Sequence, residues 1–521
     1  MQDHQTTLDR ATPATPPTTD ATRRRLLLTA ALGAPLSLLE CGGGGASESP
    51  VSPPPAAAPT LNTTLVYGLV PGSSAEESLY LHRPGGAPEP LAPALAVSSF
   101  EITPDRRALV CVARHSATPA ITALYRVDLV APFAWERLSP LPLGGNGSVR
   151  TFRISPDGAR VAFTGDLNTR DVVEVYVALI DGGTYLRVNA SVGTPPAVEF
   201  DLPFPQAWSP DGRYLLQGVR SRITGQRLAL RVHERNGTAN STQITPTLSP
   251  DTSGIGEARW LPDSSGVVFA AQLLPITAQS PFLVRLASPN RHHPLIGSTV
   301  FFDAVASDIH VAADGRAVYF LGRFSSASRS DLYTVPLSAT AGAAGPATQV
   351  GGPRPVDNSI GVTRYALSPD GTRVTYISDE QSVGIGQLLE ARVDAAAGAP
   401  VTVLNGPLAA GSTVSRFAYT PDNLALVYAA EHGTAAELFT VQRNAPARPQ
   451  RVHRAATGNG GVDLDFLVLD TLQGVAAVYA GRLAGTDPRE LYFTFLNDPG
   501  KSTRLNAPLP AGARVGSWRA I

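Results

Sequence analysis

The 521-residue sequence contains two cysteines, one methionine and a single lysine, Lys501, and only 16% of its residues are charged. Two cysteines cannot build a disulfide framework for a chain of this size, so its stability has to come from packing. The formal net charge of −1 excludes the strongly basic face that nucleic-acid binding requires. We therefore expect no nucleic-acid partner.

Motifs of common catalytic and metal sites are also missing. The nine histidines are scattered, without an H-E-x-x-H pattern or a Cys/His cluster. There is no G-x-S-x-G nucleophile elbow. Cys111 lies between Val110 and Val112, a pattern that favours a small core residue over a nucleophile. The sequence therefore predicts no metal ion, no cofactor and no catalytic set.

Glycine and proline, in contrast, are abundant, with 48 and 46 residues, and 43% of the chain is hydrophobic. Much of this excess lies in a recurring turn, Ser-Pro-Asp-Gly in its full form. Pro sets the first corner of the turn, Asp accepts backbone hydrogen bonds, and Gly takes the positive φ that closes it. The turn aspartates recur every 51 to 56 residues, at Asp105, Asp157, Asp211, Asp263, Asp314, Asp370 and Asp422.

Seven regularly spaced carboxylates also allow another interpretation, a ring of acids for metal binding or acid–base chemistry. Their fixed place beside Pro and Gly favours turn capping instead. Each turn stands between two apolar strands, and a third strand with an acid-aliphatic-aromatic pattern follows, as in Glu174-Val175-Tyr176. A short fourth strand completes the unit. Four strands in about 50 residues without helical periodicity are typical of a propeller blade.

The repeat resembles the WD40-like β-propeller repeat shared by the translocation protein TolB and by the propellers of the dipeptidyl peptidase IV and prolyl oligopeptidase families. The resemblance covers residues 61–521 and implies an all-β propeller, but not a particular function. At this spacing, the span predicts one ring of eight to nine four-stranded blades. The last blade would be closed by pairing of residues 65–69 with residues 515–519. Two smaller propellers are the alternative.

The first 60 residues predict an export signal and a tether. Arg23 and Arg24 follow a polar segment and precede an apolar stretch, too short to span a bilayer, which resembles a twin-arginine signal peptide over residues 1–40. The sequence around Cys41 resembles a bacterial lipobox, in which the cysteine is lipidated, although Glu40 departs from its usual small residue. An exported form without lipid is the alternative. Residues 41–60 are rich in Gly and Pro and predict a flexible tether.

Propeller geometry favours a binding surface on the ring face that carries the loops between the second and third strands. The candidates there are Arg114, His115, Asp166, Arg220, Arg323, Asp379, Glu431, His432 and Arg482. Solvated loops have the same composition, so their function is a hypothesis. We expect a monomeric protein of the periplasm or outer cell envelope, touching the membrane only through its lipid anchor. It would bind an envelope protein or a polar polymer. An enzyme, a lyase or hydrolase with its site at the channel mouth, is the alternative.

Overall fold

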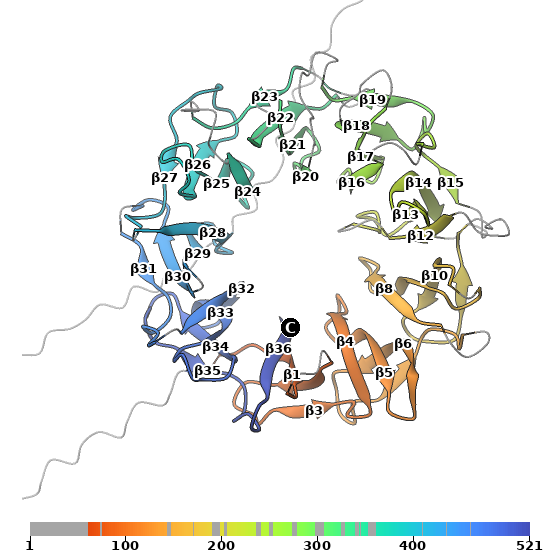
Figure 1. Cartoon of the computed structure of the whole chain (residues 1–521), viewed down its shortest axis with the longest axis horizontal. Helices are drawn as coiled ribbons and strands as arrows, with labels where there is room; N and C mark the ends of the chain where they lie inside the picture. The colour runs from red at the N-terminus through yellow and green to blue at the C-terminus, as the bar shows by residue number, and fades with distance from the viewer. Residues whose placement is uncertain are drawn as a thin grey trace, which may run out of the picture. The chain divides into compact units, whose positions relative to one another are not determined.

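The computed structural model describes residues 61–72, 76–142, 147–169, 171–189, 198–202, 206–235, 241–249, 254–273, 279–296, 307–324, 329–338, 343, 345–352, 361–408, 410–433, 435–446, 448–458 and 460–521. Every regular element in these residues is a β-strand. The strands belong to one compact unit, Pro59–Ile521, and surround a central opening (Figure 1). Arg23, Arg24 and Cys41 lie outside the described residues, so the export signal and the lipid anchor stay predictions.

The described strands form nine groups of four, blades 1 to 9, each ordered from the centre of the ring outwards (Figure 1). The innermost strands of blades 2 to 9 are, in that order, β4 (Leu95–Ile102), β8 (Val149–Ile154), β12 (Val198–Asp201), β16 (Ile255–Trp260), β20 (Ser307–Val311), β24 (Val362–Leu367), β28 (Ser412–Tyr419) and β32 (Gly461–Thr471). The innermost strand of blade 1, placed last in this and the following series, is β36 (Arg514–Ala520). The second strands, in the same order, are β5 (Ala108–His115), β9 (Arg160–Gly165), β13 (Tyr214–Ser221), β17 (Gly266–Ala271), β21 (Ala317–Gly322), β25 (Arg373–Ser378), β29 (Ala425–His432), β33 (Gly474–Arg482) and β1 (Leu65–Val70).

The outer half of each blade consists of a long third strand and a short fourth strand. The third strands are β6 (Thr118–Asp128), β10 (Glu174–Leu179), β14 (Arg227–Glu234), β18 (Ser280–Arg285), β22 (Asp331–Pro336), β26 (Gln387–Arg392), β30 (Ala435–Gln442), β34 (Glu490–Phe495) and β2 (Ser78–His82). The fourth strands are β7 (Trp135–Arg137), β11 (Tyr185–Arg187), β15 (Thr242–Gln243), β19 (His292–Pro294), β23 (Thr348–Gln349), β27 (Thr402–Val403), β31 (Gln450–Arg451), β35 (Thr503–Arg504) and β3 (Glu89–Leu91). All neighbours within a blade are antiparallel, and one residue pair, Ala436–Val462, joins blades 8 and 9 into a single sheet.

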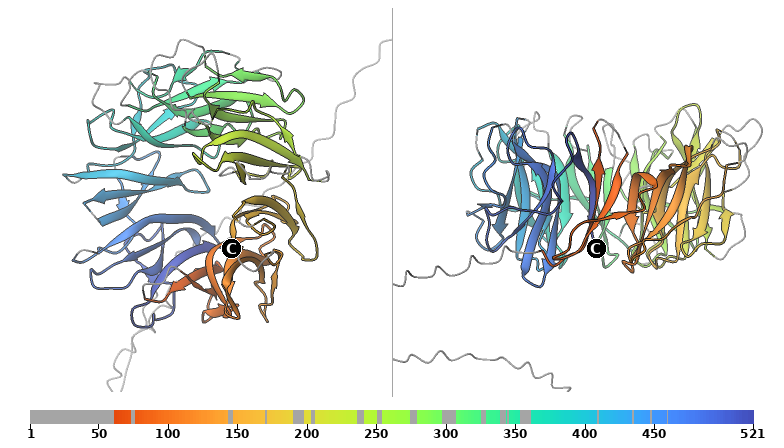
Figure 2. Two further views of the ribbon diagram at one scale, coloured as in Figure 1. Left: turned by 45° about the vertical axis from the view of Figure 1, so that its right-hand side comes forward. Right: turned by 90° about the horizontal axis from the view of Figure 1, so that it is seen from below.

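Blade 1 closes the ring, because its innermost strand comes from the C-terminus and its other three from the N-terminal side of the unit. Strand β36 pairs with β1 in the register Tyr67–Trp518 and Leu69–Val515. This confirms the predicted single all-β propeller and its closure by terminal strands. The ring has nine blades, the larger of the two numbers predicted. Seen edge-on, the blades stand side by side around the ring (Figure 2).

The hydrophobic core is divided among the interfaces between neighbouring blades. Each of nine clusters of buried apolar side chains joins two adjacent blades, for example blades 9 and 1 through Val478, Phe493, Tyr67 and Trp518. The second strand of each blade is covered on both faces, so a strand such as β17 is buried at all six residues. This burial explains why these strands are apolar throughout and do not alternate.

The recurring turn joins the first and second strands of a blade. In blade 3, Ser155 Oγ donates to Asp157 Oδ1 at 2.6 Å, and the same carboxylate oxygen accepts the Ala159 N–H at 3.1 Å. Gly158 has a φ of 70°. Where this glycine is replaced, Arg106, Ser264 and Asn423 still have a φ of 60°. The turn geometry is therefore kept even where its glycine is not.

In blades 3 and 9, the third-strand acid binds both the aromatic residue two positions later and an arginine of the fourth strand. In blade 3, Glu174 accepts hydrogen bonds from Tyr176 Oη at 3.0 Å and Arg187 Nη1 at 2.8 Å. In blade 9, Glu490 binds Tyr492 Oη at 2.7 Å and Arg504 Nη1 at 3.0 Å. The acid-aliphatic-aromatic pattern thus ties the third strand to the outermost one.

A register shift interrupts the pairing of the innermost strand with the second strand in eight of the nine blades, blade 4 being the exception among the described strands. Such a bulge re-aims the side chains beside it. In β8 it leaves the consecutive residues Arg150 and Thr151 both exposed. The innermost strands can therefore present neighbouring polar residues on the channel side.

Candidate functional site

All seven turn aspartates accept a hydrogen bond from the backbone N–H two residues later, at 2.9 to 3.1 Å. The Thr103 hydroxyl and then the Arg107 N–H lower the pKa of Asp105. The Ser368 hydroxyl and the Thr372 N–H and hydroxyl lower the pKa of Asp370 in the same way. The structure places each aspartate in its own turn, and adjacent turns belong to different blades. Across the described residues, no group of three His, Cys, Asp or Glu side chains could hold a metal ion.

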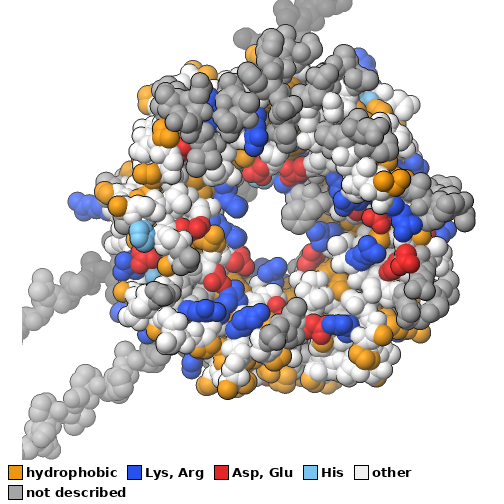
Figure 3. All heavy atoms as spheres, in the orientation of Figure 1, with side chains coloured by type: hydrophobic (Ala, Val, Ile, Leu, Met, Phe, Trp, Pro, Cys, Tyr) orange, Lys and Arg blue, Asp and Glu red, His pale blue; other side chains and the backbone are white. Residues whose placement is uncertain are grey.

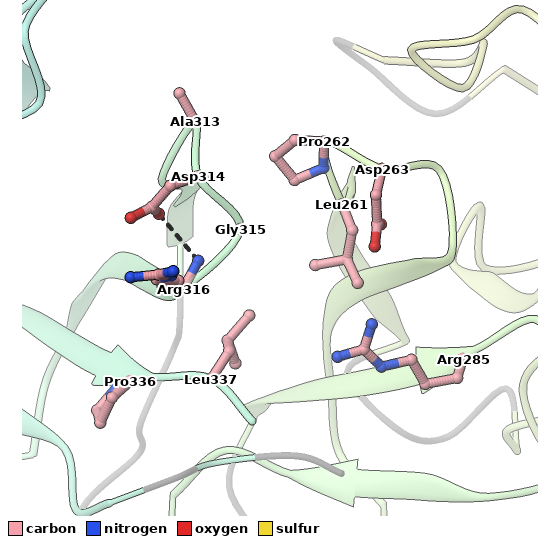
Figure 4. A pocket seen from close by; sticks show the side chains of 10 residues that line it. All are labelled: Leu261, Pro262, Asp263, Arg285, Ala313, Asp314, Gly315, Arg316, Pro336 and Leu337. Atoms are coloured by element: carbon pink, nitrogen blue, oxygen red, sulfur yellow. Dashed lines mark hydrogen bonds between the residues drawn. The ribbon is translucent and has the colours of Figure 1, made fainter. Parts of the chain in front are cut away.

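A hollow of about 770 Å³ beside two of these turns lies between blades 5 and 6 (Figure 4). Its two carboxylates, Asp263 and Asp314, serve their own turns, as the hydrogen bond to the Arg316 N–H illustrates. Arg285 donates to Ser265 Oγ at 2.9 Å and to the Ser338 carbonyl at 2.8 Å. Because these polar groups already hold the two blades, we do not assign a ligand to this hollow.

The predicted loop residues lie on seven blades, and most of them bind a group of their own blade. Asp166 accepts the Ser148 N–H at 2.8 Å, and Asp379 accepts the N–H groups of Gly361 and Gly384 at 2.9 and 3.0 Å. The other contacts are Arg220 to the Gly225 carbonyl, Arg323 to Ser330 and His432 to Ser412. Glu431 is half-buried, and Arg482 is exposed.

Two of the predicted loop residues, Arg114 and His115, line one hollow of about 330 Å³ where blades 1 and 2 meet. Arg114 forms an ion pair with Glu76, which lines the same hollow. The ring of His115 packs against Trp135 with centroids 4.7 Å apart. The structure thus brings these two together, whereas the remaining loop residues are separated by the spacing of the blades.

Charged side chains gather around the central opening, a feature that the sequence did not predict (Figure 3). They come from the innermost strands, in which a buried apolar residue is flanked by partly exposed charged or polar residues. We call this set the channel belt: Ser99, Glu101, Arg150, Thr151, Arg153, Glu257, Arg259, Asp308, His310, Arg364, Arg416, Asp465, Ser517 and Arg519. Its signal in the sequence is a polar residue on both sides of an apolar one shortly before the turn, as in Glu257-Ala258-Arg259.

Contacts across blade boundaries link much of the channel belt. Arg153 of blade 3 lies 3.5 Å from Glu101 of blade 2, and Arg416 of blade 8 lies 3.3 Å from Asp465 of blade 9. Arg259 of blade 5 donates to the Ile309 carbonyl of blade 6 at 2.6 Å. The belt therefore stabilises the ring while it presents charge to the channel.

The densest part of the belt joins blades 5, 6 and 7. His310 Nε2 lies 3.9 Å from Asp308 Oδ1, and the imidazole meets the ring of Tyr365 edge-on with centroids 5.0 Å apart. Burial lowers the pKa of His310, although Asp308 opposes this shift, so the imidazole is neutral at pH 7. Burial also raises the pKa of Tyr365. Asp308 has a left-handed φ of 50°, which is uncommon outside glycine.

The thiol of Cys111 is fully buried in the core between blades 1 and 2. Burial raises its pKa to about 12, so the thiol stays protonated at neutral pH. Cys111 therefore packs as a small apolar residue. In the part of the chain that the structure describes, no helix is long and apolar enough to cross a membrane.

No protein-family model and no curated protein matches the sequence. Among solved structures, a eukaryotic initiation factor aligns over 88% of this chain and 98% of its own, with a TM-score of 0.55 and 11% identity. A prolyl endopeptidase aligns over 76% of this chain and 55% of its own, with a TM-score of 0.43 and 13% identity. A puromycin hydrolase aligns over 80% and 53%, with a TM-score of 0.40 and 16% identity. The chain thus spans about half the length of the endopeptidase and the hydrolase. Its likeness to the initiation factor is one of fold.

Proposed function

We propose that this chain is an exported cell-envelope β-propeller, anchored by a lipid on Cys41, that binds an envelope protein or a polar polymer without carrying out chemistry. The channel belt carries the proposal, because it surrounds the ring centre with charged groups that are held in place by neighbouring blades. Groups that are already fixed lose little entropy when a polar ligand binds. The protein would act as a monomer, since its own terminal strands close the ring.

The proposed location of the protein in the cell rests on its first 60 residues. Arg23 and Arg24 would direct export, and a lipid on Cys41 would hold the mature chain at a membrane of the periplasm or outer envelope. The following Gly- and Pro-rich residues, 42–59, would separate the propeller from the bilayer.

Replacing Cys41 with serine tests the anchor. We expect the wild-type protein in the membrane fraction with the added mass of a lipid, and Cys41→Ser in the soluble fraction without it, because serine lacks the thiol that is acylated. Fractionation and intact-mass measurement check this. The matched control is Cys111→Ala, whose thiol is buried in the propeller and should not affect partitioning. If wild type and Cys41→Ser are both soluble and lipid-free, the anchor is wrong.

Crosslinking in envelope fractions tests the binding role. Wild type should capture a defined envelope component, and Cys41→Ser should capture less of it, because the propeller is no longer concentrated at the membrane. Capture of nothing beyond the background of an unrelated exported protein would contradict the binding role.

A propeller enzyme, a hydrolase or lyase, is the second candidate, and the Asp308–His310–Tyr365 arrangement favours it. A neutral imidazole beside a carboxylate and a phenol is suited to general base catalysis. An activity found in the purified protein, abolished in His310→Ala and kept in His115→Ala, would favour the enzyme over the binding module.

A further inference from the structure

Three arginines, two from blade 3 and one from blade 1, line one hollow of the channel wall together with residues of blade 2, which lies between them. The hollow measures about 640 Å³ and is lined by Arg150 and Arg153 of β8, Arg519 of β36 and Glu101 of β4. Glu101 is the only acidic residue in this lining, so the hollow has a net charge of +2. Its volume lies within the range of small-molecule sites.

The arginines differ in how far the protein already uses them. Arg153 donates to the Phe152 carbonyl at 2.5 Å and lies 3.5 Å from Glu101. Arg519 donates to the Trp518 carbonyl at 2.7 Å, and its guanidinium lies 5.9 Å from the centre of the Phe100 ring. Arg150 is exposed and makes no hydrogen bond or ion pair with any described residue. Its five N–H donors are available to a ligand.

Glu101 does not neutralise this charge. Burial raises its pKa, while Arg153, the Ile154 N–H and Arg519 partly oppose that shift. The carboxylate, on blade 2, lies 3.5 Å from Arg153 of blade 3, but one negative charge cannot balance three positive ones. The wall beside it has hydroxyl groups at Ser99 and Thr151 and buried rings at Phe100 and Phe152.

We propose that this hollow binds a small ligand carrying at least two anionic oxygen groups, phosphate or carboxylate, with Arg150 as its main contact. The planar guanidinium of an arginine can donate two parallel hydrogen bonds to the oxygens of either a phosphate or a carboxylate. A positively charged recess in a low-dielectric wall also concentrates anions. This inference rests on the proposed binding function and specifies the class of ligand.

Titration calorimetry of the full chain with pyrophosphate and, separately, with citrate tests the inference and distinguishes phosphate from carboxylate. We expect saturable binding that weakens with added salt. Arg150→Ala should weaken binding about tenfold or more, as expected for the loss of a charged hydrogen-bonding partner. Arg150→Lys should lie in between, and Glu101→Gln should bind several-fold more tightly because a repulsive charge is removed.

Arg448→Ala is the matched control, because Arg448 is an exposed arginine between β30 and β31 whose side chain has no partner among the described residues, outside this hollow and outside the channel belt. It should leave affinity within about twofold, since charges beyond a Debye length are screened. The absence of saturable binding of either anion, or equal losses in Arg150→Ala and Arg448→Ala, would overturn the site.

The two proposals can fail separately. If Arg150→Ala still captures the envelope component while neither anion binds the wild type, the ligand class is wrong and the binding module stands. If anions bind at Arg150 but crosslinking captures nothing, the anion site is supported and the envelope role is not.

Discussion

Replacing Trp518 with alanine is expected to lower the free energy of unfolding by about 3–5 kcal/mol, the usual cost of truncating a buried tryptophan. Trp518 is 2% exposed and packs with Leu65, Tyr67 and Phe493 where blade 9 meets blade 1. The measurement is urea unfolding followed by circular dichroism. The matched control is Trp135→Ala on outermost strand β7, where the tryptophan is 41% exposed and its removal should cost about 1 kcal/mol or less.

The expected loss is large because β36 is the innermost strand of the blade that closes the ring, and other contacts depend on it. Arg489 of blade 9 donates to the Gly516 carbonyl at 2.7 Å and pairs with Asp463, and Glu77 of blade 1 accepts the Ser517 N–H at 2.9 Å. Ending the chain after Ala513 should therefore expose the edge of β1 and promote self-association, visible by gel filtration. Wild-type stability in Trp518→Ala, together with a monomeric truncated chain, would show that closure contributes little.

Arg187→Ala is expected to destabilise the protein by about 2–3 kcal/mol. Its partner Glu174 is 0% exposed, so the substitution leaves a buried carboxylate without its cation. Loss of one partner of a fully buried pair costs about 3–5 kcal/mol, and we expect less here because Arg187 itself is 40% exposed. Thermal and urea unfolding measure the difference.

Arg213→Ala is the control for this effect, because Arg213 and Glu234 form an ion pair in which both side chains are about half exposed or more. Water solvates both charges after the substitution, so no measurable change is expected. Arg504→Ala removes the equivalent partner of Glu490 in blade 9 and should resemble Arg187→Ala. Equal, small effects of all three substitutions would mean that burial of the acid does not control the stability of this motif.

The repeat made much of the architecture predictable from the sequence. The Ser-Pro-Asp-Gly sequence around Asp157, and the similar sequences in other blades, specified the hairpins, because Pro, Asp and Gly each satisfy a local backbone requirement. Apolar stretches such as Val161-Ala162-Phe163 predicted strands covered on both faces, and β9 is buried between two blades. The match between residues 65–69 and 515–519 predicted the closing pair, since both ends carried unfinished parts of one blade.

The candidate site was predicted less well. The nine loop residues were chosen by their place between the second and third strands. Asp166 and Asp379 instead accept backbone N–H groups just before the innermost strand of their own blade, and Arg220 binds within its own loop, whereas Arg114 and His115 line one hollow. Local sequence cannot distinguish a loop residue that contacts a ligand from one that caps a backbone group. The contacts of each side chain had to be known.

The sequence by itself determined the repeat, its turns, its apolar strands and the number of blades to within one, because these depend on local backbone chemistry and on periodicity. Only the tertiary structure decided that nine blades form the ring. It also showed that one hollow is lined by Arg150, Arg153 and Arg519. Arg519 is far from the other two in the chain, and Arg150 and Arg153 lie on opposite sides of a buried phenylalanine. The physical reason is twofold. A bulge in the innermost strand breaks simple alternation, and ring closure brings the last strand beside the first complete blade.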